Sequence, residues 1–293
     1  MTEAAPATVA EALRRTAHRL AAAGIPDPRR EARLLVGLIL QAEPLDLLAE
    51  PERPFPEQAW PVLAAALARR CLGEPFSRIA GRRGFWSLDL TISTAVLDPR
   101  PETELLVETV LQHLGRRRNE PLRILDLGTG SGCILLALLA ELPQALGLGI
   151  DRSLRALQIA RSNASAAGLG NRSLWAAGIW AAAVAGRFDA VVSNPPYIPS
   201  GAIATLDRSV RAHDPAEALD GGPDGLAPYR QIVPSLPRLL KVGGIACLEV
   251  GRGQAPSVAS MGSKAGLGCT IHCDLAGIQR SVSLIGEKEA CIA

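Results

Sequence analysis

Ile124-Leu-Asp126-Leu-Gly128-Thr-Gly130-Ser-Gly132 joins a short apolar run to a helix that starts near Cys133, and this stretch decides the fold. Glycines let the backbone turn sharply and approach a ligand closely at a helix N-terminus. The spacing is D-x-G-x-G-x-G, which differs from the G-x-G-x-x-G of dinucleotide-binding loops. The stretch therefore predicts a ligand-binding loop at the carboxyl end of the first strand of an α/β sheet.

From this loop to the C-terminus, short apolar strands alternate with helices, as in a doubly wound α/β sheet. The last two strands are separated by only six residues, 274–279, which is too short for a parallel crossover. We therefore expect a mostly parallel, seven-stranded Rossmann-like sheet that ends in an antiparallel C-terminal hairpin. The expected strands are 123–127, 146–150, 174–177, 188–192, 245–250, 269–273 and 281–285.

The N-terminal part of the chain has a helical pattern instead. Apolar residues recur at helical spacing, and Asp27 before Pro28 predicts a helix N-cap followed by proline at the first helical position. Residues 75–97 are interpreted as two strands, 77–80 and 85–92, around a glycine-bounded turn. We expect a helical substrate-docking domain over 1–74, a β-hairpin linker over 75–97 and the α/β domain over 98–293.

The composition bears on nucleic-acid binding, metal binding, secretion and membrane insertion. The chain is 48% hydrophobic with a formal net charge of +2, and its only polybasic block is 116–118, which gives weak support for a nucleic-acid partner. Six cysteines include no C-x-x-C pair, so no metal site is expected. The first residues lack a secretion signal, and no apolar run is long enough to span a membrane. A soluble, cytoplasmic protein is the expectation.

Two further motifs end other strands. Asp151 follows the second strand, where a carboxylate can accept both hydroxyls of a ribose. Asn194-Pro195-Pro196-Tyr197 follows the fourth strand, and its prolines stop that strand because they donate no backbone hydrogen bond. This run presents a primary amide, carbonyls and an aromatic ring, which suit a planar group that carries an amine. Because the carboxyl ends of the strands meet at one crevice, we expect the glycine loop, Asp151 and Asn194 to share a ligand site.

This combination is similar to the seven-stranded methyltransferases that use S-adenosyl-L-methionine, and Asn194 to Tyr197 resembles the motif of their amino-methylating branch. Arg100-Pro-Glu-Thr-Glu104, together with the helical segment and the hairpin, resembles the HemK/PrmC family, the glutamine methyltransferases of peptide-chain release factors. The resemblance covers essentially the whole chain. It implies methyl transfer to the side-chain amide of a Gly-Gly-Gln-type glutamine in a release factor, which modulates translation termination. It also implies a cytoplasmic monomer with no direct contact to nucleic acid or membrane.

The resemblance also implies roles for single residues. The methionine part of the cofactor would lie on the glycine loop, the ribose on Asp151 and the adenine near Ile179. The residues 100–104 would close over the site. The full set of implied cofactor-binding residues is Gly128, Thr129, Gly130, Ser131, Gly132, Asp151, Ile179 and Asn194. The implied substrate-binding residues are Asn194, Pro195, Pro196 and Tyr197, of which Asn194, Pro195 and Tyr197 are expected to be catalytic.

Three positions depart from the family pattern. Gly178 stands where an acidic residue usually precedes an aromatic one by two positions, so the adenine contact is open. Asp214 stands where a glutamate usually precedes the proline. The ending, 291–293, is not the usual one of the family.

Three other functions remain open at this stage. A glutamine methyltransferase of a ribosomal protein would use the same chemistry. An adenine-amine methyltransferase would flip a base onto Tyr197 and would need a positively charged groove. A non-catalytic binding module could keep the same fold.

Overall fold

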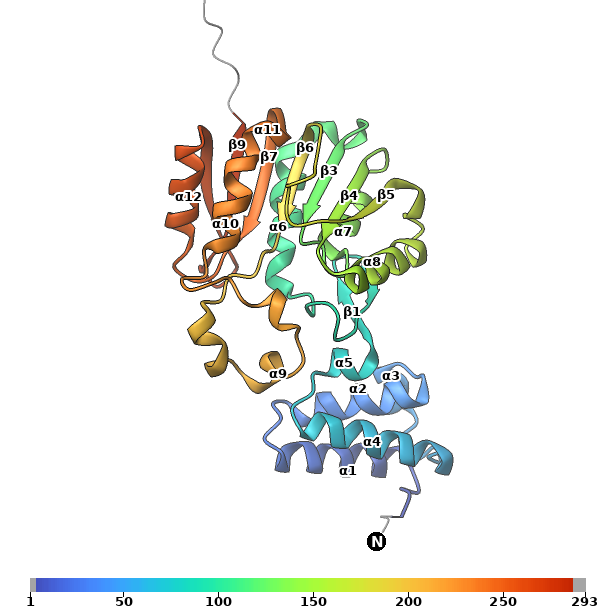
Figure 1. The fold of residues 1–293 in the computed structure, drawn as a ribbon. Coiled ribbons are helices and arrows are strands. Elements are labelled where there is room, and N and C mark those ends of the chain that lie inside the picture. The colour runs from blue at the N-terminus through green and yellow to red at the C-terminus, as the bar shows by residue number, and fades with distance from the viewer. Residues whose placement is uncertain (1–3, 287–293) are drawn as a thin grey trace, which may run out of the picture. The chain divides into compact units, whose positions relative to one another are not determined.

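The computed structural model describes residues 4–286, and Figure 1 shows their ribbon. The expectation for 291–293 lies outside the described residues. The chain divides into two compact units. The first runs to residue 81 and includes Asp207–His213, and the second comprises Arg82–Leu206 and the residues from Asp214 onward.

The first unit is helical. Thr8 and Asp27 cap its first two helices, because their side chains accept hydrogen bonds from the N–H groups of Glu11 and Arg30. The predicted cap at Asp27 with Pro28 in the first turn is therefore confirmed. The α-helices of this unit are α1 (Val9–Ala22), α2 (Pro28–Leu40), α3 (Pro44–Ala49), α4 (Trp60–Cys71), α5 (Phe76–Ala80) and α9 (Arg208–Arg211).

The prediction of a strand over 77–80 is wrong, because these residues belong to helix α5. Gly81 ends this helix in the left-handed conformation, with φ of 67°. A left-handed glycine is the usual end of a helix, and a single turn is too short to show helical periodicity in the sequence.

The sequence predicts the first strand of the hairpin over 77–80, whereas the observed hairpin begins at residue 82. It pairs β1 (Arg82–Phe85) with β2 (Leu88–Thr91) in antiparallel register. Trp86 takes the turn with φ of 54°, a conformation that non-glycine residues rarely adopt. Its backbone N–H donates to Glu104 at 2.7 Å and its ring N–H donates to Glu141 at 2.8 Å. These two carboxylates hold the tryptophan in the turn.

The second unit is built on a seven-stranded sheet with the order β5-β4-β3-β6-β7-β9-β8. The first five strands in this order pair in parallel, whereas β9 pairs antiparallel with both β7 and β8. The predicted sheet and its C-terminal hairpin are confirmed. The strands are β3 (Arg123–Leu127), β4 (Leu146–Asp151), β5 (Ser173–Ala177), β6 (Phe188–Ser193), β7 (Leu240–Glu249), β8 (Leu267–Cys273) and β9 (Gln279–Gly286).

Helices cover both faces of this sheet (Figure 1). Alternate residues of β3 point to opposite faces, so Ile124 packs in one core and Leu125 in the other. One core includes α6 and α7, and the other includes α10, α11 and α12. The helices of this unit are α6 (Glu104–Leu114), α7 (Cys133–Glu141), α8 (Leu154–Ala166), α10 (Ala227–Ile232), α11 (Leu236–Leu239) and α12 (Ala255–Lys264).

Short 3₁₀ turns complete both units: η1 (Glu57–Ala59), η2 (Pro101–Thr103), η3 (Gly115–Asn119), η4 (Gly170–Arg172), η5 (Ser200–Thr205), η6 (Ala216–Ala218) and η7 (Val233–Ser235). Within residues 4–286, no helix combines the length and apolarity that a membrane crossing requires. The same residues contain no cluster of three or more His, Cys, Asp or Glu side chains that could hold a metal ion.

Candidate active site

The strand order reverses between β3 and β6, because β4 and β5 follow on one side of β3 and β6 and β7 follow on the other. The glycine loop leaves β3 and Asn194 leaves β6, so both motifs emerge from adjacent strand ends. The Ser193 hydroxyl donates to the Leu127 carbonyl at 2.6 Å and links these two ends. Ligands of open α/β sheets bind at such a reversal.

The glycine loop is held in place by backbone hydrogen bonds to the neighbouring strand β4. Gly128, Gly130 and Gly132 have φ of 74°, 56° and 81°, which side chains disfavour. The Ile150 carbonyl accepts the N–H groups of Gly128 and Thr129 at 2.8 and 2.9 Å. The loop therefore presents a fixed backbone at the start of α7.

Asp151 anchors the same loop from the end of β4. One carboxylate oxygen accepts the Gly130 N–H at 2.9 Å, and the other accepts the Ser153 N–H at 2.8 Å. A carboxylate offers about four acceptor sites, so these two bonds leave capacity for ligand hydroxyls. Asp151 thus both shapes the loop and faces the ligand site.

Asp126 lies beneath the loop and is fully buried. The Thr129 hydroxyl donates to its carboxyl group at 2.6 Å. Burial raises the pKa of Asp126 to about 7, against the lowering effect of that hydrogen bond. Asp126 therefore supports the loop from below.

A cavity of about 740 Å³ opens at these strand ends, within the size range of small-molecule sites. It brings together most of the predicted site residues: Gly128, Thr129, Gly130, Ser131, Asp151, Ile179, Asn194 and Pro196. The rest of the lining comes from segments to which the sequence assigned no ligand contact, including Ala95–Leu97, Pro215, Glu217 and Asp220–Gly222. A continuous site thus joins the glycine loop to Asn194.

Three predicted residues do not line this cavity. Gly132 precedes α7 as its N-cap residue, where a side chain would lie 3.0 Å from the Trp175 ring. Pro195 is buried, between Asn194 and Pro196, which both line the cavity. The hydroxyl of Tyr197 donates to Glu249 at 3.4 Å, and its ring packs against Gly251. Gly132 therefore allows close packing against Trp175. The Tyr197 hydroxyl is directed to the buried Glu249 and not into the cavity.

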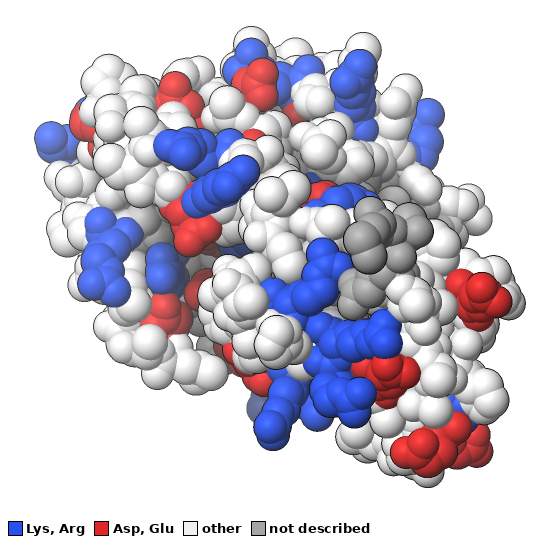
Figure 2. All heavy atoms as spheres, turned by 90° about the horizontal axis from the view of Figure 1, so that it is seen from below, with Lys and Arg blue, Asp and Glu red and all other residues white. Residues whose placement is uncertain are grey.

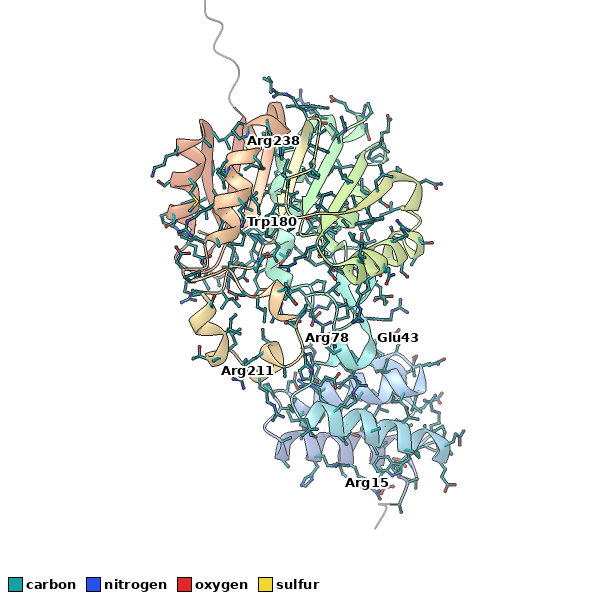
Figure 3. The ribbon with its side chains drawn as sticks, in the orientation of Figure 1. Arg15, Glu43, Arg78, Trp180, Arg211 and Arg238 are labelled. Atoms are coloured by element: carbon teal, nitrogen blue, oxygen red, sulfur yellow. The ribbon has the colours of Figure 1, made fainter. Side chains whose placement is uncertain are left out.

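The segment 178–180 lies at the adenine end implied by the resemblance. Ile179 is 61% exposed and lines the cavity. Trp180, labelled in Figure 3, has φ of 49°, and its ring lies 3.1 Å from where a side chain on Gly128 would begin. Trp180 therefore packs against the glycine loop. The cavity offers an exposed apolar side chain here, while Gly178 contributes no carboxylate.

Asn194 contacts Thr103, a residue of the segment 100–104 that was expected only to close over the site. The Asn194 side-chain N–H donates to the Thr103 hydroxyl at 3.2 Å. The buried carboxyl group of Glu249, at the end of the adjacent strand β7, accepts the Tyr197 hydroxyl at 3.4 Å. Burial raises the pKa of Glu249 to about 7. The sequence feature that could have drawn attention to Glu249 is a carboxylate at the end of an otherwise apolar strand.

Arg100 and Asp214 connect two segments of the cavity wall. Their side chains form an ion pair of 2.6 Å, and Asp214 also accepts the backbone N–H of Asp98 at 3.2 Å. The neighbouring residues Pro99 and Pro215 line the cavity. The aspartate that replaces the usual glutamate therefore has a defined partner in this chain.

The regions that match known protein families make up most of the chain. Residues 11–81 match the PrmC N-terminal domain, and residues 85–210 match the methyltransferase small domain. The "Release factor glutamine methyltransferase" of Rhodospirillum rubrum is 52% identical over 92% of this chain and 82% of its own length. The chain belongs to the release factor glutamine methyltransferase family. The protein of the same name from Bradyrhizobium diazoefficiens is 44% identical over 93% of both chains.

The fold is also shared with more distant proteins. The catalytic domain of hMettl16, solved with a MAT2A 3'UTR hairpin, superposes with a TM-score of 0.58 at 16% identity, over 76% of this chain and 83% of that one. At this identity the likeness concerns the fold alone. Membership of the family makes the chain a methyltransferase that uses S-adenosylmethionine.

Proposed function

We propose that this chain transfers a methyl group from S-adenosylmethionine to the side-chain amide nitrogen of the Gly-Gly-Gln-type glutamine of a peptide-chain release factor. The observation that carries the proposal is one cavity lined by both the glycine loop and Asn194. Relatives of that name align along nearly the whole chain, which supports the choice of substrate.

The residues present fit the cofactor. A side chain added at Gly130 would meet nothing within 4 Å, so the loop leaves open space beside its backbone. The Asp151 carboxylate faces the same space and retains acceptor capacity for the ribose hydroxyls. Exposed Ile179 provides an apolar surface for the adenine. When bound there, S-adenosylmethionine supplies an electrophilic methyl group.

The work of the protein is to orient a weak nucleophile. The lone pair of an amide nitrogen is delocalised into its carbonyl group, so the nitrogen must be held in position. The Asn194 side-chain oxygen and the Pro195 carbonyl would accept the two N–H bonds of the glutamine and aim its nitrogen. Fixing two reactants in this way contributes up to ~7–11 kcal/mol in favourable cases.

Proton balance requires no dedicated base in this scheme. One N–C bond forms, the S–C bond of the donor breaks, and one N–H proton leaves once the nitrogen carries the methyl group. That proton is far more acidic after methylation, so water can accept it. The chain residues need only hold the amide until the transfer is complete.

Methylation of purified substrates tests the proposal. The full-length protein is incubated with radiolabelled S-adenosylmethionine and either a release factor, the same factor with its glutamine changed to glutamate, a ribosomal protein, or duplex DNA. Label is expected on the release factor and not on its glutamate variant. Label on the ribosomal protein or DNA alone would reject the proposal.

The competing substrates are less well supported. The formal net charge is only +2, and basic side chains on the face shown in Figure 2 are bordered by acidic ones. A nucleic-acid methyltransferase gains affinity from many phosphate contacts and favours a continuous basic groove. A monomer that contacts no nucleic acid remains our expectation.

A further inference from the structure

We infer that Asn163 is a positioning residue that joins two parts of the cavity lining, so that binding of S-adenosylmethionine to one part steadies the other. The two parts are the glycine loop 128–132 and the segment 91–97, which contributes Ala95–Leu97 to the lining. The inference rests on the place proposed above for the cofactor and not on the choice of protein substrate.

The side chain of Asn163 binds both parts directly. Its amide nitrogen donates to the Ser131 carbonyl at 2.9 Å and to the Thr91 carbonyl at 3.1 Å. Its amide oxygen accepts the Thr91 backbone N–H at 2.8 Å. Ser131 lies in the glycine loop and Thr91 ends strand β2, so one side chain bonds two segments that are far apart in the sequence.

Backbone partners fix the direction of this amide. A carbonyl oxygen can only accept and a backbone N–H can only donate, so the Asn163 nitrogen must face the two carbonyls. Both of its N–H groups and its oxygen are then used, and Asn163 is only 2% exposed, so water does not compete for these bonds. Asparagine is a weak helix former, and the three bonds account for a buried one inside helix α8.

Apolar contacts of α8 also hold the segment 91–97. Ile92 and Val96 are buried and pack with Ala156 and Ile159 of this helix. Val96 and Ala156 both line the cavity. Helix α8 therefore holds this stretch of the lining by an apolar contact as well as by hydrogen bonds.

Because one amide group makes all three bonds, the contacts to Ser131 and Thr91 open and close together. Turning the Asn163 side chain away would leave its amide and the Ser131 carbonyl without partners, which is costly in a buried place. A cofactor that holds the glycine loop makes this opening rarer, and the segment 91–97 is then held more firmly as well. By linkage, a change that breaks the Thr91 bonds should weaken cofactor binding.

Two substitutions break the connection from its two ends. Asn163→Ala removes the amide, and Thr91→Pro removes the backbone N–H of a residue that lies outside the cavity lining. Proline is tolerated on an edge strand, and β2 pairs with β1 alone. Each substitution should raise the Kd for S-adenosylmethionine, measured by calorimetric titration, at least about fivefold, the lower end of typical coupling between sites.

The two variants have matched controls. Thr94→Pro introduces the same residue nearer in sequence to the cavity lining, at the second position of the turn closed by the Val96 N–H and the Ser93 carbonyl, where proline suits the backbone. Asn171→Ala removes an exposed asparagine amide in η4. Val258→Ala truncates a fully buried side chain of α12 and reports how a general loss of stability affects the Kd. All three controls should bind S-adenosylmethionine as the wild-type protein does.

The double variant distinguishes a shared connection from two independent losses of stability. If Asn163 carries the effect of Thr91, Thr91→Pro should raise the Kd in the wild-type background and have no further effect in Asn163→Ala. Fully additive effects on the binding free energy would overturn the inference. A wild-type Kd in Asn163→Ala would overturn it as well.

A measurement on the wild-type protein needs no substitution. Hydrogen exchange followed by NMR reports how often the Thr91 N–H opens, with and without S-adenosylhomocysteine. This analogue should slow exchange both at the glycine loop and at Thr91. Slower exchange at the loop with unchanged exchange at Thr91 overturns the inference and leaves the proposed place of the cofactor standing. Unchanged exchange at the loop itself overturns both.

Failure of the proposed substrate is recognised from different data. If the protein methylates no release factor, the substrate proposed above is wrong. The binding and exchange measurements still decide the role of Asn163, because they use only the cofactor and its analogue.

Discussion

The backbone N–H of Gly130 donates a 2.9 Å hydrogen bond to the carboxylate of Asp151, so the glycine loop and the predicted ribose-binding residue are one structural unit. The bond joins the ends of adjacent parallel strands, β3 and β4. A change at either residue should therefore alter both the shape of the loop and the affinity for the cofactor.

Gly130→Ala tests this unit directly. A side chain at φ of 56° costs about 1–2 kcal/mol of stability, and this one would also project into the cavity. Gly168→Ala is the control, because Gly168 has φ of 70°, open space and no place in the cavity. Calorimetric titration should show weaker binding of S-adenosylmethionine to Gly130→Ala only. Equal affinity in the two variants would contradict the assignment of the loop.

Asn194→Ala should abolish methyl transfer and leave cofactor binding partly intact. The substitution removes the acceptor for the glutamine N–H while the glycine loop and Asp151 remain unchanged. We expect kcat to fall by ~100-fold or more, as for other losses of reactant alignment. Asn119→Ala, at an exposed position in η3, serves as the control. Activity retained in the Asn194 variant would remove this residue from the mechanism.

Asp126 should make stability depend on pH in an unusual direction. Burial raises its pKa from 3.8 to about 7, so the folded state binds a proton that the unfolded state has lost. Its contribution is fully present below about pH 4 and disappears as the pH rises to about 7, by up to ~1.4 kcal/mol per pH unit. Asp126→Asn should therefore gain stability relative to wild type across this window in urea unfolding.

The control for this pH dependence is Asp224, whose pKa is lowered to about 2 by its hydrogen bond with Arg230. Both its folded and unfolded forms are ionised over most of the range from pH 4 to 7. The effect of Asp224→Asn on the free energy of unfolding should therefore change little between pH 4 and 7. If the difference in free energy of unfolding between wild type and Asp126→Asn does not change with pH, the buried carboxyl group does not titrate in this window.

The Arg100–Asp214 pair should couple the two segments of the cavity wall that carry Pro99 and Pro215. The Asp214 side chain is 2% exposed, so Arg100→Ala removes an ion-pair partner from a buried carboxyl group. A double-mutant cycle with Asp214→Asn should give a coupling energy of about 1–3 kcal/mol in the free energy of unfolding. Additive effects of the two substitutions would show that the pair does not hold these segments together.

Much of the fold could be predicted because local patterns encode it. Seven apolar runs identify the strands, and the short 274–279 connection requires the final antiparallel pair. The errors lie where local signals are weakest. Helix α5 is a single turn, and β7 begins at Leu240, ahead of the predicted 245, because strand boundaries depend on pairing partners. Residues 207–213 belong with the helical unit, which no local pattern reveals.

The sequence by itself determined the chemistry that is available: a glycine loop, a carboxylate and an asparagine at three strand ends. The tertiary structure decided how these groups are held. Asp151 binds the loop, Thr103 binds Asn194, and Glu249 binds Tyr197. The physical reason is that hydrogen-bond direction depends on partners far apart in the chain. A residue type sets which atoms can donate or accept, and only the packed fold sets which of them face the cavity.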